Sequence, residues 1–589
     1  MENYDLLGLT GGEILHQRLT SHGVSHVFGH PGGPAAAIFN DVYGSPVIRF
    51  IPSRYERGAG HMAEGYAKAT RRPGVVLIST DLSNSNMVTP ILDGLLDRAP
   101  MVVICGQIAT AQGADAFHKT DAIERVQPCM KWRTRVQRLS ELPRAIDAAF
   151  RHAKHRQPGP VLVEMADGIG EAVFDPQALK ESSNVSLIVE QVDGEARSPV
   201  SLMSSTIHLY ERIDRVADVI NQSRSPVICA GHGVLASASG CMLLSKISRK
   251  AHIPVATTLL GLGSFDETRE EALHMIGTHG APYANYAIQN ADLLIVIGAR
   301  LDERAVGNAD GFAPKARDKD GGGRGIVHFD INAAKLGKVI KPTEIIIGDL
   351  SETLPILLSR LKPGKERGEW LDQIQMWKKA YSLQVPPSTR NSRPHPQQVV
   401  AELNRQTIPM KSSTTITTGV GQHQMWTSQH FRCTHPHSLI TSGSPSTMGF
   451  SLPAAIGAKL ALPDQQVIAV DCDSSFCTTI EELMTALLYQ IQIKVIVFNN
   501  RQPGIIFPMQ RSNYGAKSYC DVQTNTDFDR LARSVGYQGQ RCESIEQLPH
   551  SIFWLLRCRG PALLDVAVSE PGVISLASNG TALEVMNLV

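Results

Sequence analysis

The sequence predicts an α/β protein built from three doubly wound domains, each with a parallel sheet. Short runs of apolar, β-branched residues recur along the chain and are continuous rather than alternating, which is typical of parallel strands buried on both faces. Stretches with helical periodicity lie between them, so strand and helix patterns alternate. Two stretches without clear periodicity, residues 180–202 and 363–396, indicate linkers that divide the chain.

The first domain is predicted over residues 1–185. We expect a helix over 11–22, a strand that ends at 28, and strands over 47–51, 75–78, 101–104 and 158–163. A long helix follows the strand at 47–51, and its apolar stripe includes Ala59, Met62 and Tyr66. Glu56 stands in the first turn of this helix, where position alone indicates a favourable interaction with the helix dipole.

The middle domain is predicted over residues 203–362, with strands at 226–230, 293–297 and 326–329. Each strand ends in a glycine-rich or polar turn. Such turns let a dinucleotide approach the backbone, and an acid after a strand can bind a ribose hydroxyl, but ordinary strand-to-helix turns have the same composition. Both interpretations stay open for the turn residues Gly231, Gly233, Gly277, His279, Gly280, Gly298, Arg300 and Asp330.

The third domain is predicted over residues 396–575 and contains the most informative stretch of the chain. Strands are expected at 467–470 and 494–498, with a helix between them that a capping box of Thr478 and Glu481 would begin. Asp473 follows the first strand and Asn500 follows the second. Carboxyl ends of adjacent parallel strands meet at one sheet edge, and carboxylate and amide oxygens suit Mg²⁺.

Composition points to small-molecule chemistry. The 589 residues carry a formal net charge of +1, which gives no reason to expect nucleic acid or an anionic membrane as a partner. Ten cysteines are scattered without C-x-x-C pairs, which favours free thiols over a disulfide framework or a zinc site. The first residues have neither a basic nor an apolar signal pattern, so we expect a cytoplasmic location, and no run is apolar enough to span a membrane.

Seven motifs recur in order along nearly the whole chain: residues 29–33 (GHPGG), 56–67 (ERGAGHMAEGYA), 115–117 (DAF), 418–426 (TGVGQHQMW), 447–450 (TMGF), 472–474 (CDS) and 499–500 (NN). In this order they resemble the large subunit of acetolactate synthase (acetohydroxyacid synthase), a thiamine diphosphate enzyme. The resemblance implies decarboxylation of a 2-oxo acid, with pyruvate as the first candidate, and carboligation to a second carbonyl. It also implies a homodimer or homotetramer with active sites between subunits.

Site residues follow from the matched motifs. Glu56 falls on the glutamate that exchanges a proton with the pyrimidine ring, which replaces the helix-dipole interpretation. His118 and Gly33 fall at further active-site positions, and Phe117, Ile506 and Met509 at the substrate pocket. The Mg²⁺ ligands match Asp473, Asn500 and Gln502. Thiamine diphosphate positions match Val420, Gly421, Gln422, His423, Met448, Ser474, Ser475 and Gly504. The glycine-rich turns of the middle domain fall in loops that bind FAD, which is mostly structural in this family.

Several residues depart from the family pattern. Cys472 replaces the first glycine of the diphosphate motif, where backbone ordinarily approaches phosphate. Residues 80–86 (TDLSNSN) replace a compact glycine turn, and His118 replaces a glutamine. Met509 replaces the tryptophan that lines the acceptor pocket, which exchanges a rigid wall for a flexible one. Pro34, Ala109 and Thr278 replace family residues around the substrate and herbicide channel.

Three interpretations remain at this stage. The first is an active carboligase with an altered acceptor pocket, in specialised metabolism. The second is an ordinary acetolactate synthase of branched-chain amino acid synthesis that inhibitors do not affect. The third is a non-catalytic homologue that acts as a partner subunit, against which the retention of Glu56, Asp473, Asn500 and Met448 argues.

Overall fold

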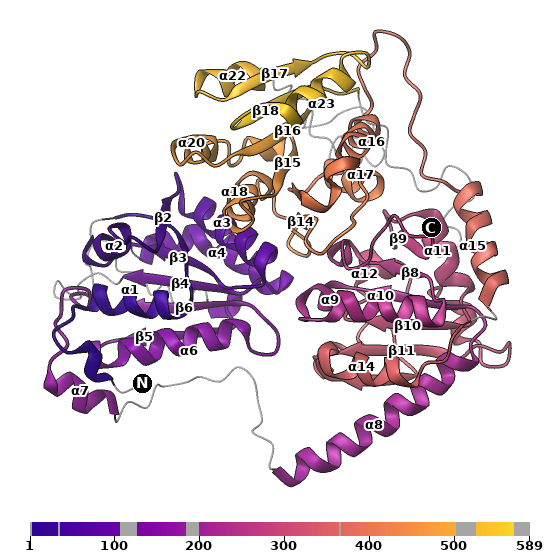
Figure 1. The fold of residues 1–589 in the computed structure, drawn as a ribbon, viewed down its shortest axis with the longest axis horizontal. Helices are drawn as coiled ribbons and strands as arrows, with labels where there is room; N and C mark the ends of the chain where they lie inside the picture. The colour runs from indigo at the N-terminus through magenta and orange to yellow at the C-terminus, as the bar shows by residue number, and fades with distance from the viewer. Residues whose placement is uncertain are drawn as a thin grey trace.

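Three parallel six-stranded sheets form the framework of the computed structural model (Figure 1). The structure describes residues 3–32, 36–79, 81–106, 127–183, 199–364, 367–501 and 526–569. Strands buried on both faces account for the continuous apolar runs in the sequence. The predicted fold class is confirmed.

The first sheet has the strand order β2-β1-β3-β4-β6-β5. The helix before β1 begins with a capping box in which Thr10 Oγ1 accepts from the Glu13 N–H and the Glu13 carboxylate accepts from the Thr10 N–H. The strands are β1 (His26–His30), β2 (Arg49–Pro52), β3 (Gly74–Ile78), β4 (Met101–Gly106), β5 (Trp132–Val136) and β6 (Pro160–Met165). The helices are η1 (Asn3–Leu6), α1 (Gly11–Ser21), α2 (Ala36–Tyr43), α3 (Glu56–Thr70), α4 (Asp81–Asp97), η4 (Gln127–Cys129), η5 (Leu139–Glu141), α6 (Leu142–Lys154) and α7 (Pro176–Ser183).

The central sheet has the order β12-β11-β10-β7-β8-β9. Numbered within the sheet, this is the 3-2-1-4-5-6 order of dinucleotide-binding folds, whose switch point lies between β7 and β10. The strands are β7 (Pro226–Ala230), β8 (Val255–Thr257), β9 (Ala272–Met275), β10 (Leu293–Ile297), β11 (Gly325–Asp330) and β12 (Glu344–Ile347). The helices are α8 (Pro199–Gln222), α9 (His232–Ala236), α10 (Gly240–Ala251), η6 (Leu259–Gly261), α11 (Pro282–Asn290), α12 (Glu303–Val306), α13 (Pro314–Arg317), η7 (Ala333–Lys335), α14 (Leu350–Arg360) and α15 (Gly368–Ala380).

The third sheet has the order β14-β13-β15-β16-β18-β17, which repeats the topology of the first sheet strand for strand. Its switch point lies between β13 and β15. The strands are β13 (Thr414–Thr418), β14 (Leu439–Thr441), β15 (Gln466–Cys472), β16 (Ile493–Asn499), β17 (Gln538–Cys542) and β18 (Ala562–Ala567). The helices are α16 (Pro396–Thr407), η9 (Ile408–Ser413), α17 (Gln422–His430), α18 (Ser451–Ala461), α19 (Asp473–Phe476), α20 (Glu482–Leu488), α22 (Phe528–Ser534) and α23 (Leu548–Arg557).

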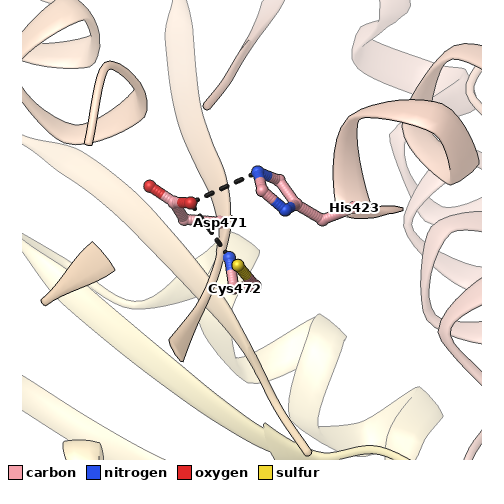
Figure 2. A group of neighbouring side chains, drawn as sticks. All are labelled: His423, Asp471 and Cys472. Atoms are coloured by element: carbon pink, nitrogen blue, oxygen red, sulfur yellow. Dashed lines mark hydrogen bonds and ion pairs between the residues drawn. The ribbon is translucent and has the colours of Figure 1, made fainter. Parts of the chain in front are cut away.

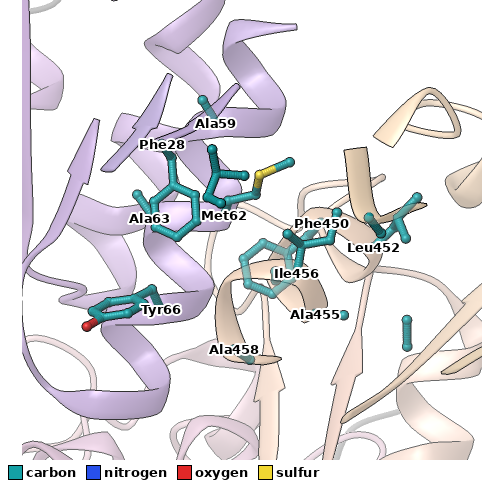
Figure 3. Packing of buried hydrophobic residues seen from close by; sticks show 14 of the residues in the cluster. Phe28, Ala59, Met62, Ala63, Tyr66, Phe450, Leu452, Ala455, Ile456 and Ala458 are labelled. Atoms are coloured by element: carbon teal, nitrogen blue, oxygen red, sulfur yellow. The ribbon is translucent and has the colours of Figure 1, made fainter. Parts of the chain in front are cut away.

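The first and third units share one hydrophobic core. Helices α3 and α18 cross at their junction, and Met62 of α3 belongs to the same buried cluster as Phe450 and Ile456 (Figure 3). Glycines allow the two backbones to approach, because a Cβ atom on Gly65 would lie 2.6 Å from Ala454 Cα. Burying this apolar surface fixes the start of α3 against the third unit.

Replacing a glycine at this crossing is expected to destabilise the protein. Gly65→Ala places a methyl group against the α18 backbone, so we expect a loss of roughly 1–3 kcal/mol from overpacking. Thermal unfolding followed by circular dichroism measures it as a lower midpoint. Gly368→Ala is the matched control, since a Cβ atom there would have no neighbour within 4 Å. Equal midpoints for the two variants would show that the crossing tolerates the methyl group.

Two local predictions were wrong. The capping box at Thr478 and Glu481 does not form: α20 begins at Glu482 without a side-chain cap, and Thr478 Oγ1 instead donates to the Ser475 carbonyl at 2.8 Å. The stretch predicted as a linker at 363–396 contains α15, whose Trp370 and Ile374 pack into the central core. The stretch predicted as a linker at 180–202 overlaps α7 and α8, and residues 184–198 lie outside the described ones.

Candidate functional site

The predicted convergence of Asp473 and Asn500 is present at the edge of the third sheet. Asp473 is the first residue of α19, directly after β15, and its Oδ2 accepts the Arg501 N–H at 2.8 Å. Its Oδ1 accepts the Ser474 N–H at 2.7 Å. The chain after β16 therefore lies against the carboxylate that follows β15, at the sheet edge that open α/β folds use for ligands.

The chemistry of Asp473 suits a bound cation. The side chain is 1% exposed, and burial raises its pKa above the usual value. Within the described ranges, no basic side chain forms an ion pair with it. A buried carboxylate without a counter-charge is costly, and a divalent ion would supply that charge. Asp473 and Asn500 therefore fit a magnesium site, while the third predicted ligand, Gln502, lies outside the described residues.

Cys472 fits the diphosphate motif without backbone strain. Its φ and ψ are −102° and 163°, an extended conformation open to any residue. Burial, with Asp471 and Asp473 beside it, raises the pKa of the thiol well above its ordinary value. The side chain is half-buried, in a position where the family motif has no side chain at all.

The loop after β13 explains one of the predicted glycines. Gly421 has φ 155° and ψ −175°, a region that glycine alone adopts readily, and a Cβ atom there would lie 2.7 Å from His423 Nδ1. Val420 is partly exposed on this loop. Gln422 and His423 begin α17 and are buried, and His423 Nε2 lies 3.2 Å from Asp471 Oδ1 (Figure 2). The His423 ring therefore faces the end of β15.

A second loop brings Met448 to the same edge. Met448 is 44% exposed, which is unusual for a large apolar side chain and suits contact with a ligand. Gly449 next to it has φ 80°, and its N–H donates to Ser475 Oγ at 2.9 Å. Thr479 Oγ1 donates to the Gly449 carbonyl at 2.8 Å. Ser475, predicted to bind the cofactor, is fully buried and supports the Met448 loop.

Glu56 begins α3 and is only 8% exposed. Its Oε2 accepts a hydrogen bond from Asn86 Nδ2 at 3.1 Å, and Asn86 Oδ1 in turn accepts one from the Tyr55 hydroxyl at 2.8 Å. Asn86 of α4 therefore orients the Glu56 carboxylate. Helix α4 contains most of the divergent stretch at 80–86. Sequence reasoning did not identify Asn86 as a partner of Glu56.

The third unit holds the start of α3 in place. Glu482 of α20 is fully buried, and its carboxylate accepts the N–H groups of Arg54 at 3.2 Å and Tyr55 at 3.3 Å. Burial raises the pKa of Glu482 to about 7. The Arg57 guanidinium donates to the Thr478 carbonyl. These contacts join residues more than 400 positions apart, so no local pattern could have revealed them.

Seven predicted site residues cannot be placed. Outside the described ranges lie Gly33, Phe117, His118, Gln502, Gly504, Ile506 and Met509. Their predicted roles stay predictions.

A groove lies at the switch point of the central sheet, where β7 and β10 end. It consists of two adjoining cavities of about 390 and 250 Å³, both bordered by His232, Leu260, Gly298 and Arg300. His279 lines the first cavity, and Gly233 and Asp330 line the second. This position and combined size suit a dinucleotide.

Three predicted glycines do not line this groove. A Cβ atom on Gly231 would meet Gly298 and Ala299, one on Gly277 would meet the Arg304 carbonyl, and one on Gly280 would meet the backbone of Met275 and Ile276. These contacts are with backbone, so the ordinary-turn interpretation holds for them, because close chain packing already requires glycine.

Charged residues in the second cavity fit a flavin dinucleotide. Asp330 ends β11, its Oδ1 accepts the Asn332 N–H at 2.8 Å, and burial raises its pKa. An acid here suits ribose hydroxyls. Basic side chains for a diphosphate come from the first unit as well as from the central one: Arg98, Lys154, Arg156, Arg300 and Lys335. The sequence analysis did not predict Arg98, Lys154 and Arg156, because they do not lie in glycine-rich turns of the middle domain.

One segment connects this groove with the edge of the third sheet at which Asp473 lies. Asp97 of α4 accepts the N–H groups of Gly443 at 2.7 Å and Ser444 at 3.0 Å, and it pairs with Lys68 at 2.9 Å. Gly443 and Ser444 line the flavin groove, and Ser444 Oγ accepts from Arg300. The same segment, residues 443–449, continues to Met448.

Comparison with known proteins identifies the family. The chain is 43% identical, over 569 residues, to the mitochondrial acetolactate synthase catalytic subunit of Aspergillus candidus, covering 96% of this chain and 81% of that protein. The chain belongs to the acetolactate synthase large-subunit family. The mitochondrial acetolactate synthase of Schizosaccharomyces pombe is 42% identical (96% and 84% covered), and the large subunit of Parasynechococcus marenigrum is 33% identical (95% and 88%).

Three family models match this chain, one in each of its three structural units. The N-terminal TPP binding domain of thiamine pyrophosphate enzymes matches residues 9–125, the central domain 213–357 and the C-terminal TPP binding domain 419–566. The chain is therefore a thiamine diphosphate enzyme of the carboligase and decarboxylase type, and Mg²⁺ and FAD are characteristic of its family. Both fungal relatives are named mitochondrial, so a cytoplasmic location stays a prediction. Within the described residues, no helix has the length and apolarity to cross a bilayer.

Proposed function

We propose that this protein decarboxylates a 2-oxo acid, with pyruvate as the first candidate, and joins the resulting acyl group to a second carbonyl compound. The observation that carries the proposal is the meeting of Asp473 with the chain after β16, at the carboxyl ends of the neighbouring strands β15 and β16. The family membership and the orientation of buried Glu56 by Asn86 support it.

Each residue has a definite task in this proposal. Asp473, Asn500 and Gln502 would hold Mg²⁺, which would neutralise charge on the diphosphate. Glu56 exchanges a proton with the pyrimidine ring, and Met448 and Val420 border the cofactor. Thiamine diphosphate, when bound, supplies the carbon that adds to the 2-oxo acid and accepts the electron pair that CO₂ leaves behind.

The test is CO₂ release across a panel of 2-oxo acids that begins with pyruvate, with thiamine diphosphate and Mg²⁺ present. We expect release, and identification of the coupled product distinguishes the first two interpretations. Acetolactate from pyruvate alone indicates an ordinary synthase, and another acyloin indicates a different acceptor. Absence of release from every donor, without cofactor binding, would contradict the proposal and favour a non-catalytic partner subunit.

We further propose an altered acceptor pocket, which would suit a specialised pathway. It is supported by Met509 at the position of the family tryptophan. We expect Met509→Trp to shift the product ratio toward the 2-ketobutyrate adduct, because a rigid aromatic wall restores shape selection. Competition between pyruvate and 2-ketobutyrate measures the ratio, and Met376→Trp, at an exposed methionine of α15, is the control. An unchanged ratio in Met509→Trp would refute the altered pocket.

Flavin binding has its own expected outcome. Asp330→Ala removes the acid that we assign to the ribose, and loss of a hydrogen bond to a charged group, worth about 1.5–3 kcal/mol, should weaken FAD binding about 10- to 150-fold. Flavin fluorescence on reconstitution measures the affinity. Asp320→Ala, an exposed acid on the same unit, is the control. Equal affinities in the two variants would contradict the assignment of Asp330.

We also propose a homodimer in which the site is completed by two subunits. Exposed apolar side chains support it: Met484 and Leu488 on α20 are 45% and 61% exposed, and Tyr43 of α2 is 67% exposed. Arg49 of β2, the strand that follows α2, donates to the carbonyl of Tyr489 at the end of α20 at 2.6 Å. Such side chains on adjoining elements indicate a protein interface.

A further inference from the structure

A buried cluster of charged side chains lies where helices α3 and α4 meet the segment 443–449. Its members are His61, Glu64 and Lys68 of α3 and Asp93 and Asp97 of α4. The three carboxyl groups are at most 1% exposed. The proposed reaction gives Asp93 no task, so a third buried acid in this cluster requires an explanation.

The charges of this cluster do not balance if every acid is ionised. Three carboxyl groups share one ammonium, that of Lys68, which lies 2.8 Å from Glu64 Oε1 and 2.9 Å from Asp97 Oδ2. His61 Nδ1 lies 3.1 Å from Glu64 Oε2. Even with a positive charge on the imidazole, three carboxylates would leave a net negative charge in a dry site, which is strongly unfavourable. We therefore expect one of the three acids to hold a proton.

The contacts identify Asp93 as the protonated acid. Asp97 pairs with Lys68 and accepts two N–H groups of the segment 443–449, and these donors hold the pKa of Asp97 below its ordinary value although burial alone would raise it. Among the described residues, no ammonium, guanidinium or imidazole nitrogen forms an ion pair with Asp93. Burial, followed by the nearby charge of Glu64, raises the pKa of Asp93 to about 8.

Thr447 connects Asp93 with Met448. The Thr447 hydroxyl approaches the Asp93 carboxyl, at a geometry looser than a full hydrogen bond, and Thr447 directly precedes Met448. Ser444 and Met448 of the same segment are exposed, whereas Asp93 is fully buried. An ionised Asp93 would have neither a counter-charge nor water around it. Displacement of the segment 443–449 from α4 is therefore the route by which water would reach an ionised Asp93.

We infer that Asp93 is a positioning residue which, in its neutral form, lets the segment 443–449 pack against α4 and so holds Met448 in place. The packing itself is independent of the proposed reaction, whereas its effect on thiamine diphosphate rests on the task that we assign to Met448. When the Asp93 proton passes to solvent, the new anion faces the like charge of Glu64, and the packed arrangement becomes less stable.

The direction of the pH dependence follows from the raised pKa of Asp93. The packed arrangement is favoured while the proton is bound, below about pH 8, and is lost as the pH rises through that value. The groups that face Asp93 are His61, Glu64 and Lys68 from α3, Asp97 from α4, and the Thr447 hydroxyl from the segment 443–449. Replacing Asp93 alone should therefore remove this pH response.

The test is hydrogen exchange of the full-length protein without cofactor, followed by mass spectrometry of the peptide 442–450. Asp93→Asn has the shape of the neutral acid and cannot ionise. We expect equal protection in Asp93→Asn and the unmodified protein about one unit below the Asp93 pKa, and loss of protection in the unmodified protein alone about one unit above it. Asp93→Ala should have lower protection at both pH values, because it lacks the polar group. Peptides from β10 report any general loosening of the protein.

Thiamine diphosphate affinity at saturating Mg²⁺ gives a second readout. Between the same two pH values, the affinity of the unmodified protein should fall about tenfold relative to that of Asp93→Asn, because the protonated fraction falls by that factor. The same loss of protection in Asp93→Asn as in the unmodified protein would overturn the inference, and so would a pH response that Asp93→Ala retains. Failure of every protein to bind thiamine diphosphate would contradict the proposed function, while hydrogen exchange would still decide the role of Asp93.

Discussion

Glu56→Gln is expected to lower the rate of CO₂ release by at least about 100-fold, the lower end of what proton transfer by a positioned side chain contributes. Glutamine has the same shape and can keep the hydrogen bond to Asn86, but it cannot exchange a proton with the cofactor ring. The carboxylate is largely buried, so water has little access to replace it. The rate is measured at saturating cofactor, which separates the chemical step from binding.

Tyr55→Phe is the matched control for Glu56→Gln. It removes the hydroxyl that donates to Asn86 Oδ1 and leaves the Glu56 carboxylate intact. We expect a smaller loss, since the hydroxyl acts only through Asn86. Full turnover by Glu56→Gln would show that the proton is exchanged elsewhere and would remove the central residue of the proposed mechanism.

Asp473→Ala is expected to weaken thiamine diphosphate binding at least about 100-fold, because removing a charged ligand costs several kcal/mol in a buried ion site. The structure gives this expectation its physical basis: the side chain is 1% exposed and lies against the Arg501 N–H. Isothermal titration with thiamine diphosphate at fixed Mg²⁺ measures the affinity. Asp464→Ala, an exposed acid before β15, is the control.

The two inactive variants together test where the site is formed. In a mixture of Glu56→Gln and Asp473→Ala subunits, a mixed dimer has one site with both original residues if the site lies between subunits. Random pairing of equal amounts should then restore about one quarter of the original activity. No recovery after mixing would place Glu56 and Asp473 of one site on the same chain. Unchanged cofactor affinity in Asp473→Ala would refute the magnesium assignment itself.

Local signals predicted the fold class and one edge of the site. Continuous apolar runs mark buried parallel strands, and Asp473 and Asn500 come directly after two of them, so the sheet geometry alone brings them together. Helix α15 was missed because prolines and charges around it resemble a linker, whereas two tryptophans, Trp370 and Trp377, pack it onto the central unit. The helical structure of this segment therefore depends on its burial against the central unit rather than on its local composition.

The contacts that fix Glu56 could not be predicted from the sequence. The Glu482 carboxylate accepts the N–H groups of Arg54 and Tyr55, which lie 428 and 427 positions earlier in the sequence. No local sequence pattern around a single helical glutamate predicts such a distant partner. The basic residues Arg98 and Arg156 reach the flavin groove from another unit for the same reason. Glycines gave a mixed signal: Gly298 borders the groove, but Gly277 and Gly280 are required by backbone packing.

The segment 443–449 links the flavin groove to Met448, so a bound flavin could influence the thiamine site without electron transfer. One end of it borders the flavin groove and the other carries Met448, with Asp97 binding it from α4. Occupancy of the groove therefore limits the conformations available to the residue that we place against thiamine diphosphate. Linkage is reciprocal, so each cofactor should raise the affinity for the other. On this reasoning, the flavin would act as an allosteric effector of the thiamine site.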